Sequence, residues 1–332
     1  MGTAEVGVLI EALMQQQLSE DQVTLLQGFL ASVEQPGQCL RLIEEAAGRP
    51  PCPHCGCEKS HRCGQASGLQ RYRCVACRRS FNALTGTPLA HLRLRDKWLQ
   101  YLQCLIESTP VRSAASRVAV AKSTSFRWRH RFIAAIRRAP RPQLSGIVEA
   151  DETYLLESQK GSRHLDRPPR KRGDKASRRS ISSELDCILA ARDRNRQTCD
   201  FVTGRGPVNA GQLMKHLKPV LAPDVLLVTD AAKAYQAFAT RASITHEAIN
   251  VRAGIRARGA HHIQGVNGWH GRFKTWLRRF NGVASRYLAN YTGWLRVLDT
   301  AELTTPRQWL RIAVAHPRVV VSLSRSACKK VP

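Results

Sequence analysis

The stretch IVEAD at residues 147–151 is a short apolar run that ends on the carboxylate of Asp151. The stretch VLLVT at residues 225–229 runs in the same way into Asp230, 79 positions further along the chain. Both runs have the length and composition of buried strands. If the two strands are neighbours, their carboxylates converge at one end of a sheet and could hold one or two Mg²⁺ ions. Strand-end aspartates are also common as helix caps, so the sequence at this point leaves both roles open.

Further stretches complete a sheet around these two strands. Residues 187–191 and 198–202 are predicted strands on either side of a turn signal at 193–195, and a last strand is expected near 244–250. Helices are expected after the candidate N-cap Asn209, over 231–240 and over about 262–280. Three strands in hairpin order, followed by alternating helices and strands, predict a mixed five-stranded sheet with helices packed on it.

The chain has no acidic residue between Glu247 and Asp299, which limits the choice of a third metal ligand. Glu247 falls on or before the fifth strand, so a ligand from the long helix that follows must be neutral. Asn267 offers such a ligand, and Asn267, His270 and Lys274 lie on one helical face at i, i+3 and i+7. Lys274 would bind a phosphate two turns along the helix. Alternatively, Asn267 is a residue of the helix N-terminus without a metal role.

Two CxxC motifs, CPHC at residues 52–55 and CVAC at residues 74–77, are separated by 18 residues. Two tight turns of this kind direct four thiolates at one ion and complete a tetrahedral, structural Zn²⁺ site without an open position. Cys57 and Cys63 lie nearby and leave some freedom in which thiols take part. The predicted zinc ligands are Cys52, Cys55, Cys74 and Cys77.

Residues 96–138 are predicted to be helical and resemble a helix-turn-helix. The second helix contains STSFRWRHRF at residues 123–132, and Phe126 is expected to face the core with Ile133 and Ile136. Any helical hairpin with a basic exposed face would look similar. The predicted DNA contacts on this helix are Arg127, Arg129 and Arg131.

The charge of the chain indicates a polyanionic partner. Among 332 residues, 52 are Lys or Arg and 25 are Asp or Glu, which gives a net charge of +27. Residues 1–50 are acidic, while 51–150 and 151–332 are strongly basic. A charge of this size favours nucleic acid, although a merely solvated surface and an anionic membrane surface are alternatives. The predicted DNA contacts in the basic loop 160–180 and on the long helix are Lys171, Arg172, Arg272, Lys274 and Arg278.

The sequence also gives expectations about the compartment. No window reaches the roughly 18 uninterrupted apolar residues that a membrane span needs. Glu5 and Glu11 stand where a signal peptide would have basic residues. Eleven cysteines, an odd number, favour reduced thiols and metal ligands over a disulfide framework. A cytoplasmic protein is expected.

Several motifs occur in order along the chain. They are YRC at 72–74 through FNALTGT at 81–87, VEADETY at 148–154, VTDAAKAY at 228–235, HIQGVNGWHGRFKTWL at 262–277, and FNGVASRYL at 280–288 continuing to Trp294. Together they resemble a branch of bacterial insertion-sequence transposases of the DDE superfamily, over about residues 50–298. The resemblance implies an N-terminal zinc ribbon and a ribonuclease-H-like catalytic domain in which Asn, followed by Lys, replaces the third acid. It also implies that Asp151, Asp230 and Asn267 hold Mg²⁺ or Mn²⁺ and that Lys274 contacts the DNA end.

The resulting prediction is a multidomain α/β protein. Its parts are a helical segment of unknown role at 1–50, a zinc ribbon at 51–90, a helix-turn-helix-like region at 91–140, a ribonuclease-H-like mixed five-stranded sheet with flanking helices at 145–298, and a C-terminal tail at 299–332. The predicted function is a transposase that cuts double-stranded DNA at transposon ends and joins them to target DNA. A homo-oligomer is expected because two ends must be brought together. The alternatives are a non-catalytic zinc-ribbon regulator, an inactive transposase remnant, and a nuclease without strand transfer.

Overall fold

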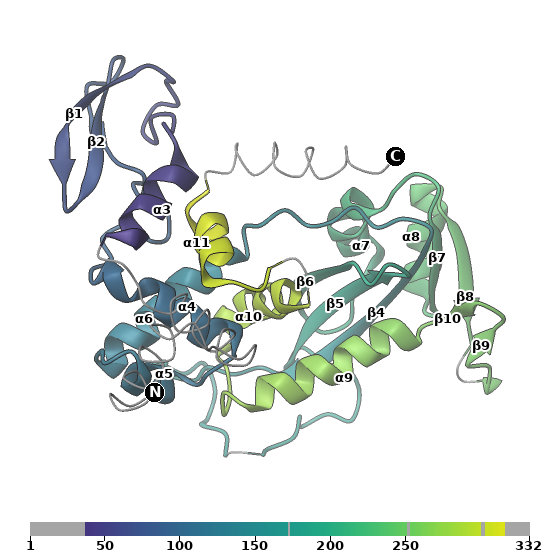
Figure 1. Cartoon of the computed structure of the whole chain (residues 1–332). Coiled ribbons are helices and arrows are strands. Elements are labelled where there is room, and N and C mark those ends of the chain that lie inside the picture. Colours follow the sequence, from purple (N-terminus) through teal and green to yellow (C-terminus); the bar gives the residue numbers. More distant parts are fainter. Residues whose placement is uncertain (1–36, 172, 251–252, 300–302, 316–332) are drawn as a thin grey trace, which may run out of the picture.

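The computed structural model describes residues 37–171, 173–250, 253–299 and 303–315 (Figure 1). A helix expected over residues 4–33 and the predicted DNA contact Arg172 lie outside the described residues. In the described part of the chain, no helix combines the length and apolarity needed to cross a membrane.

A five-stranded mixed sheet forms the C-terminal half of the molecule, as predicted. Its spatial order is β6-β5-β4-β7-β8. Strand β5 is antiparallel to its two neighbours, β4 and β6, while β4, β7 and β8 run parallel. Because β4 is central, the strand that carries Asp151 is paired on both sides. The bounds are β4 Ile147–Leu156, β5 Leu185–Asp193, β6 Thr198–Arg205, β7 Leu226–Asp230 and β8 Thr245–Ile249.

Helices cover both faces of this sheet (Figure 1). On one face, Val148 and Ala150 share a buried cluster with Tyr235 and Phe238 of α8. On the other face, Val228 packs in a cluster with Val266, Trp269 and Phe273 of α9. Since side chains alternate along a strand, Asp151 of β4 and Asp230 of β7 belong to the face covered by α9. The helices are α7 Ala210–His216, α8 Lys233–Ala242 and α9 Gln264–Arg278, and a two-stranded ribbon, β9 Ala257–Arg258 and β10 His261–His262, precedes α9.

A helical body adjoins the sheet and is built from distant parts of the chain. Trp98 of α4, Phe132 of α6, Trp294 of α10 and Trp309 of α11 all belong to one buried cluster. The segment expected to be a C-terminal tail therefore contributes a helix to this core. Its start is fixed by a capping box between Thr305 and Gln308. The helices are α3 Gln38–Ala47, α4 Trp98–Ile106, α5 Val111–Arg117, α6 Lys122–Ile136, α10 Ser285–Leu298 and α11 Pro306–Val314.

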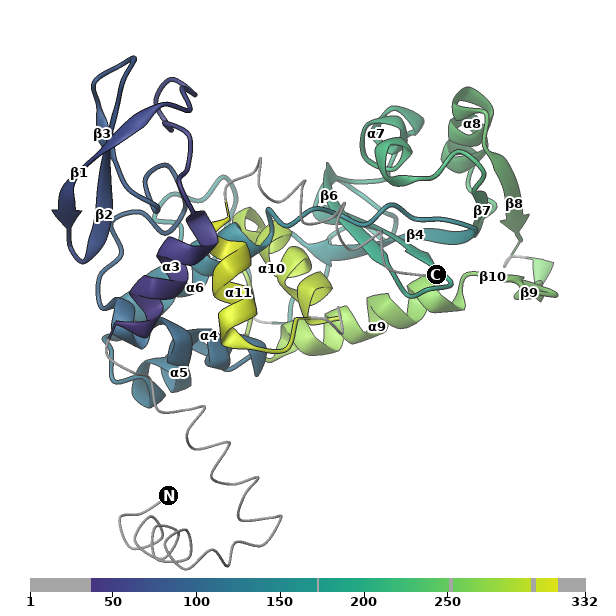
Figure 2. The ribbon, with the colours of Figure 1, turned by 45° about the horizontal axis from the view of Figure 1, so that its top comes forward.

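The two CxxC motifs lie in a small three-stranded module that stands beyond α3, away from the five-stranded sheet (Figure 2). Its antiparallel strands are β1 Ser60–Ala66, β2 Leu69–Cys74 and β3 Ser80–Phe81. Besides Cys52 and Cys74, the buried side chains of its own cluster are those of Tyr72 and Phe81. Such a small apolar core does not stabilise a module of this size by itself.

Candidate active site

Asp151 lies in the middle of β4, which continues to Leu156, so the expectation that this strand ends on Asp151 is wrong; Asp230 ends the neighbouring parallel strand β7. The ladder between β4 and β7 pairs Glu149 with Val228, so two residues further on in each strand Asp151 lies beside Asp230. Both side chains are partly buried, and the Asp151 side chain retains 20% of its exposure. The two predicted carboxylates are therefore neighbours on the face under α9.

The negative charges around Asp151 favour the binding of a cation. Burial, together with the charges of Glu152 and Asp230, raises the pKa of Asp151 to about 7, although a hydrogen bond from the Glu152 backbone and the charge of Lys274 act in the opposite direction. A carboxyl group with a raised pKa is destabilising when ionised, so the folded protein loses stability as the pH rises through about 7. A bound divalent cation would remove this repulsion.

Glu152 is a third carboxylate of the site, and the sequence motifs did not single it out. It lies on the opposite face of β4 from Asp151, where the hydroxyl of the buried Tyr235 donates to Oε1 and the Tyr154 hydroxyl donates to Oε2 over 3.4 Å. Burial and the charge of Asp230 raise the pKa of Glu152. The available signal was its position directly after Asp151 in the sequence.

Asp230 also has a local structural role. Its Oδ1 accepts a hydrogen bond of 3.1 Å from the backbone N–H of Ala232, the residue that precedes α8. This bond stabilises the turn before the helix and is not the helix cap that the sequence left open, because the N-cap of α8 is Ala232 and has no side-chain cap bond.

Helix α9 presents the remaining predicted residues to the carboxylates. His270 is buried, and its Nδ1 lies 3.7 Å from Oδ2 of Asp151, while its buried Nε2 has no hydrogen-bond partner among the residues that the structure describes. Burial, and secondarily the charge of Lys274, lowers the pKa of His270 to about 4, so the ring is neutral at pH 7. Asn267 lies one turn earlier and Lys274 one turn later on the same face, and both are exposed. Among the described residues, no hydrogen bond joins the Asn267 side chain to either aspartate.

The four predicted zinc ligands form one compact group. The Sγ atoms of Cys52, Cys55, Cys74 and Cys77 all lie within 4.8 Å of one another. Two of the S···S distances, Cys52 to Cys77 and Cys55 to Cys74, are 3.6 Å. A Zn–S bond of about 2.3 Å in a tetrahedron requires S···S distances of about 3.8 Å, so the donor set fits zinc. The backbone N–H of Cys77 lowers the pKa of the Cys74 thiol, while the hydrogen bond between Cys55 and Cys74 helps to raise the pKa of the Cys55 thiol, so without a metal the two neighbouring thiols do not ionise together.

The three predicted arginines of α6 do not share one face. Arg127 and Arg131 are exposed, but Arg129 is buried with 1% relative exposure. Its guanidinium donates to the carbonyl of Thr109 and lies over the rings of Phe280 (5.3 Å) and Trp294 (5.4 Å). The prediction that Arg129 contacts DNA is therefore wrong. Residues two apart on a helix point about 200° away from each other, so only Arg127 and Arg131 can share a face.

Phe126 also differs from its predicted position. It was expected in the core, but its side chain is 46% exposed. Its ring packs edge-on against His130 with ring centroids 4.4 Å apart, and His130 stacks on Tyr287 of α10 at 3.8 Å. The apolar face of α6 therefore begins after Phe126, with Trp128.

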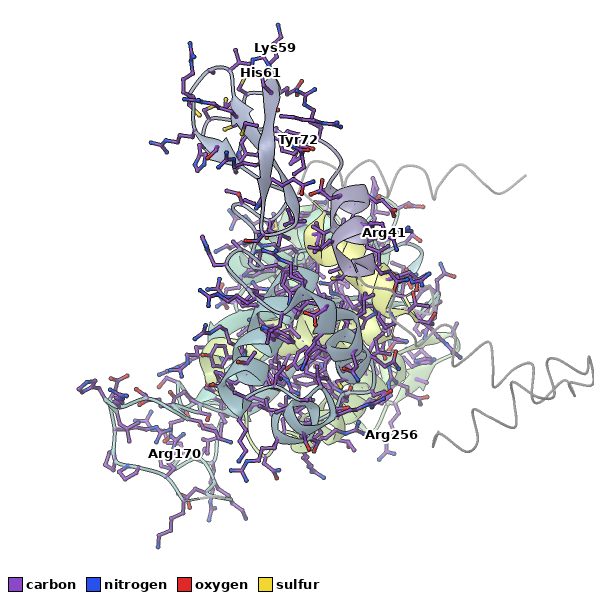
Figure 3. The ribbon with its side chains drawn as sticks, turned by 60° about the vertical axis from the view of Figure 1, so that its left-hand side comes forward. Arg41, Lys59, His61, Tyr72, Arg170 and Arg256 are labelled. Atoms are coloured by element: carbon purple, nitrogen blue, oxygen red, sulfur yellow. The ribbon has the colours of Figure 1, made fainter. Side chains whose placement is uncertain are left out.

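The basic loop between β4 and β5 extends from the body of the protein (Figure 3). Its base is held by the buried Glu157, which accepts from Arg167 over 3.0 Å and pairs with Arg170 at 3.9 Å. Lys171 is exposed further along the loop. Figure 3 places Lys59 and His61 on the zinc-ribbon module, well away from the loop around Arg170.

Two further predicted DNA contacts lie on α9. Arg278 is exposed. Arg272 keeps 51% of its side-chain exposure and pairs with Asp299 at 3.2 Å. Together with Lys274, they give this helix a basic outer surface.

Comparisons with known proteins identify the domain that holds these residues. A family model for the ISXO2-like transposase domain matches residues 143–295. This range contains both aspartates, all five strands of the sheet and helix α9. The site described above thus lies in a segment that matches a transposase domain, and over residues 143–295 the match agrees with the predicted resemblance to insertion-sequence transposases of the DDE superfamily.

A relative and a solved structure were also found. The chain is 28% identical over 243 residues to a protein in transposable element ISH50 of Halobacterium salinarum, a match that covers 72% of this chain and 82% of that protein. The crystal structure of a pre-cleavage Mos1 transpososome matches with 12% identity over 70% of this chain and 79% of that one, at a TM-score of 0.28. A TM-score of this size carries no argument.

Proposed function

We propose that this transposase cleaves DNA at the ends of its element in a reaction that depends on divalent metal ions, and joins the freed 3′ hydroxyl to target DNA. The observation that carries the proposal is the convergence of Asp151 and Asp230, from two parallel strands of a transposase domain, under a helix that presents Asn267, His270 and Lys274. This arrangement supports the ribonuclease-H-like catalytic domain that the sequence motifs imply.

The residues fit a site for Mg²⁺ or Mn²⁺. Asp151 and Asp230 offer carboxylate oxygens, the ligands that these hard cations prefer, and Asn267 would add an amide oxygen from α9. The raised pKa of Asp151 reflects a surplus of negative charge that a cation would neutralise. When bound, the metal ions would activate water or a 3′ hydroxyl and neutralise charge on the phosphate.

The side chains of the protein position the DNA strand for this reaction. Lys274 lies near Asp151 on the exposed face of α9, where it would bind a phosphate beside the bond to be cut. His270, neutral and buried against Asp151, limits the directions in which the Asp151 carboxylate can turn. Arg278 and Arg272 would extend the phosphate contacts along the helix. Catalysis of this kind rests on positioning and charge stabilisation.

Separate surfaces would bind the DNA outside the active site. The exposed N-terminal part of α6, with Arg127 and Arg131, would contact the element end, and Lys171 and Arg172 of the basic loop would contact flanking or target DNA. The Cys₄ group would hold a structural Zn²⁺ that shapes the ribbon. Two copies of the chain would bring two ends together.

The decisive experiment incubates the purified protein with Mg²⁺, labelled element ends and a supercoiled target plasmid. Ends cut and joined to the plasmid support the proposal. Cut ends without joined products would instead indicate a nuclease of this fold. Binding without cutting would indicate a DNA-binding regulator or an inactive remnant.

Arg127→Ala should weaken DNA binding and Arg129→Ala should lower stability, although the two residues are only two positions apart. Arg127→Ala should weaken binding of element ends several-fold without changing the Tm. The slope of the logarithm of the binding constant against the logarithm of salt concentration should fall by about one, as expected for the loss of one phosphate contact. Arg129→Ala should lower the Tm by several degrees, because it removes two aromatic contacts and a buried hydrogen bond. Thermal melts and binding titrations at several salt concentrations measure both effects. Weakened end binding by Arg129→Ala at an unchanged Tm would contradict the placement of Arg129 in the core.

A further inference from the structure

A buried carboxylate that has no part in the mechanism above lies two residues before Asp151. Glu149 of β4 is 2% exposed, and the alternation of the strand directs it to the same face as Asp151. That face is covered by α9. A charged side chain in this position requires partners within the protein.

The partners of Glu149 come from three separate segments. Its Oε2 accepts the backbone N–H of Val266 over 2.9 Å, and its Oε1 pairs with the guanidinium of Arg194, from the turn between β5 and β6. His262 of β10 lies 3.3 Å from the same Oε1. Val266 belongs to the first turn of α9, whose N-cap, Ile263, makes no side-chain cap. Glu149 therefore supplies from a neighbouring strand the acceptor that a capping residue would normally provide.

The backbone of α9 approaches this carboxylate as closely as a glycine permits. A Cβ atom at Gly265 would lie 3.0 Å from both carboxylate oxygens of Glu149. Any larger residue would push the helix away from the strand or turn the carboxylate out of its contact with Val266. The position of the helix start thus depends on a pair of residues, Glu149 and Gly265.

We infer that Glu149 is a positioning residue that holds the first turn of α9 against β4 and so sets the placement of Asn267, His270 and Lys274 relative to Asp151. The inference rests on the proposed function for its activity readout. The physical reason is direct, because Asp151 and the carboxylate that anchors α9 are only two residues apart on one central strand. A shift of the helix start displaces Asn267, which is the residue directly after Val266.

The test compares three variants with the wild-type protein in single-turnover cleavage of labelled element ends at saturating DNA and Mg²⁺. Glu149→Ala should slow cleavage by about 100-fold, the size expected for a displacement of about 1 Å, with end binding unchanged. Gly265→Ala should slow it less, by roughly tenfold, because its Cβ requires a shift of only a few tenths of an ångström. Glu149→Gln keeps an oxygen that can accept from Val266, so it should restore the rate to within about tenfold of the wild type. Gly265→Ala changes no polar side chain and raises helix propensity, so a slow Gly265→Ala variant cannot be attributed to lost helix stability.

Asp200→Asn is the matched control. Asp200 is also buried and paired with an arginine, Arg296, at 2.8 Å, but it joins β6 to α10 and not β4 to α9. The Asp200→Asn variant should have a lower Tm, as Glu149→Ala should, but the cleavage rate of the folded variant should equal that of the wild type. Equal slowing by Asp200→Asn and Glu149→Ala would reduce Glu149 to a general contribution to stability and overturn the inference.

Amide hydrogen exchange of residues 264–270 separates this inference from the proposed function. Exchange in this segment should be faster in Glu149→Ala than in Asp200→Asn and in the wild type, whether or not the protein cuts DNA. If the wild type does not cut any DNA, the proposed function fails while the exchange experiment still tests the role of Glu149. Unchanged exchange in α9, or a wild-type cleavage rate in Glu149→Ala, would overturn the inference.

Discussion

Asp151→Asn and Asp230→Asn should each reduce metal-dependent cleavage of element ends by at least about a thousandfold, because each removes a charged metal ligand from a site built for phosphoryl transfer. Binding of the same DNA should remain within about threefold of the wild type, since the phosphate contacts lie on other residues. Gel-based cleavage assays and binding titrations on one DNA substrate measure the two effects. Wild-type cleavage by either variant would remove that aspartate from the active site.

Two controls make this prediction sharper. Asp224→Asn changes an exposed aspartate six positions before Asp230, outside the cluster, and should cleave like the wild type. The Tm provides the second control. Asp151→Asn should not lower the Tm in metal-free buffer at pH 8, because it removes an ionised carboxylate whose pKa is raised by burial and by its acidic neighbours. A large fall in Tm would mean that Asp151 is needed mainly for folding.

Cys74→Ser should abolish zinc binding and unfold the ribbon module. The module's own buried cluster contains only Tyr72 and Phe81 besides two of the cysteines, so its fold depends on the metal. Zinc binding to such modules is associated with roughly 10–16 kcal/mol of apparent free energy, far more than this apolar core provides. Metal analysis should find about one zinc per wild-type chain and none in the variant, and limited proteolysis should cut the variant within residues 51–90.

Cys63→Ser is the matched control for this experiment. Cys63 lies on β1 and is half-buried like Cys77, but it stands outside the group of four sulfur atoms. It should keep its zinc and its resistance to protease. Loss of zinc from Cys63→Ser, with retention by Cys74→Ser, would show that another set of thiols holds the ion.

Most strands of the sheet could be predicted because they contain a short apolar run bounded by turn residues, whereas β8, THEAI at residues 245–249, is largely polar. The predicted run 147–151 continues as β4 to Leu156, and the predicted run 225–229 corresponds to β7 within one residue. The helix α11 was not predicted, although Thr305-Pro306-Arg307-Gln308 is a capping box with proline at the first helical position. The amphipathic pattern of α11 is too short to stand out in the sequence. Its packing partners are the helices α3, α4 and α6, which are distant in sequence and meet α11 only in the folded chain.

The candidate metal ligands could be predicted from the sequence, but the contacts that position them could not. Strand-end aspartates and the acid-free stretch drew attention to Asp151, Asp230 and Asn267. The interactions of Glu149 with Val266 and Arg194 were not foreseeable, because they depend on which face of β4 meets α9. The error at Arg129 was avoidable, since the angular spacing of a helix excludes a common face for three arginines at every second position.

The shared core of the helical body fixes helix α6 relative to helices α10 and α4. Arg129 of α6 is held between Phe280 and Trp294, and Trp294 of α10 donates to the Leu105 carbonyl of α4. Helix α10 is in turn tied to β6 by the ion pair between Arg296 and Asp200 at 2.8 Å. Under the proposed function, in which α6 binds the element end and the sheet carries the active site, this connection predicts a fixed number of base pairs between the bound sequence and the cleaved bond.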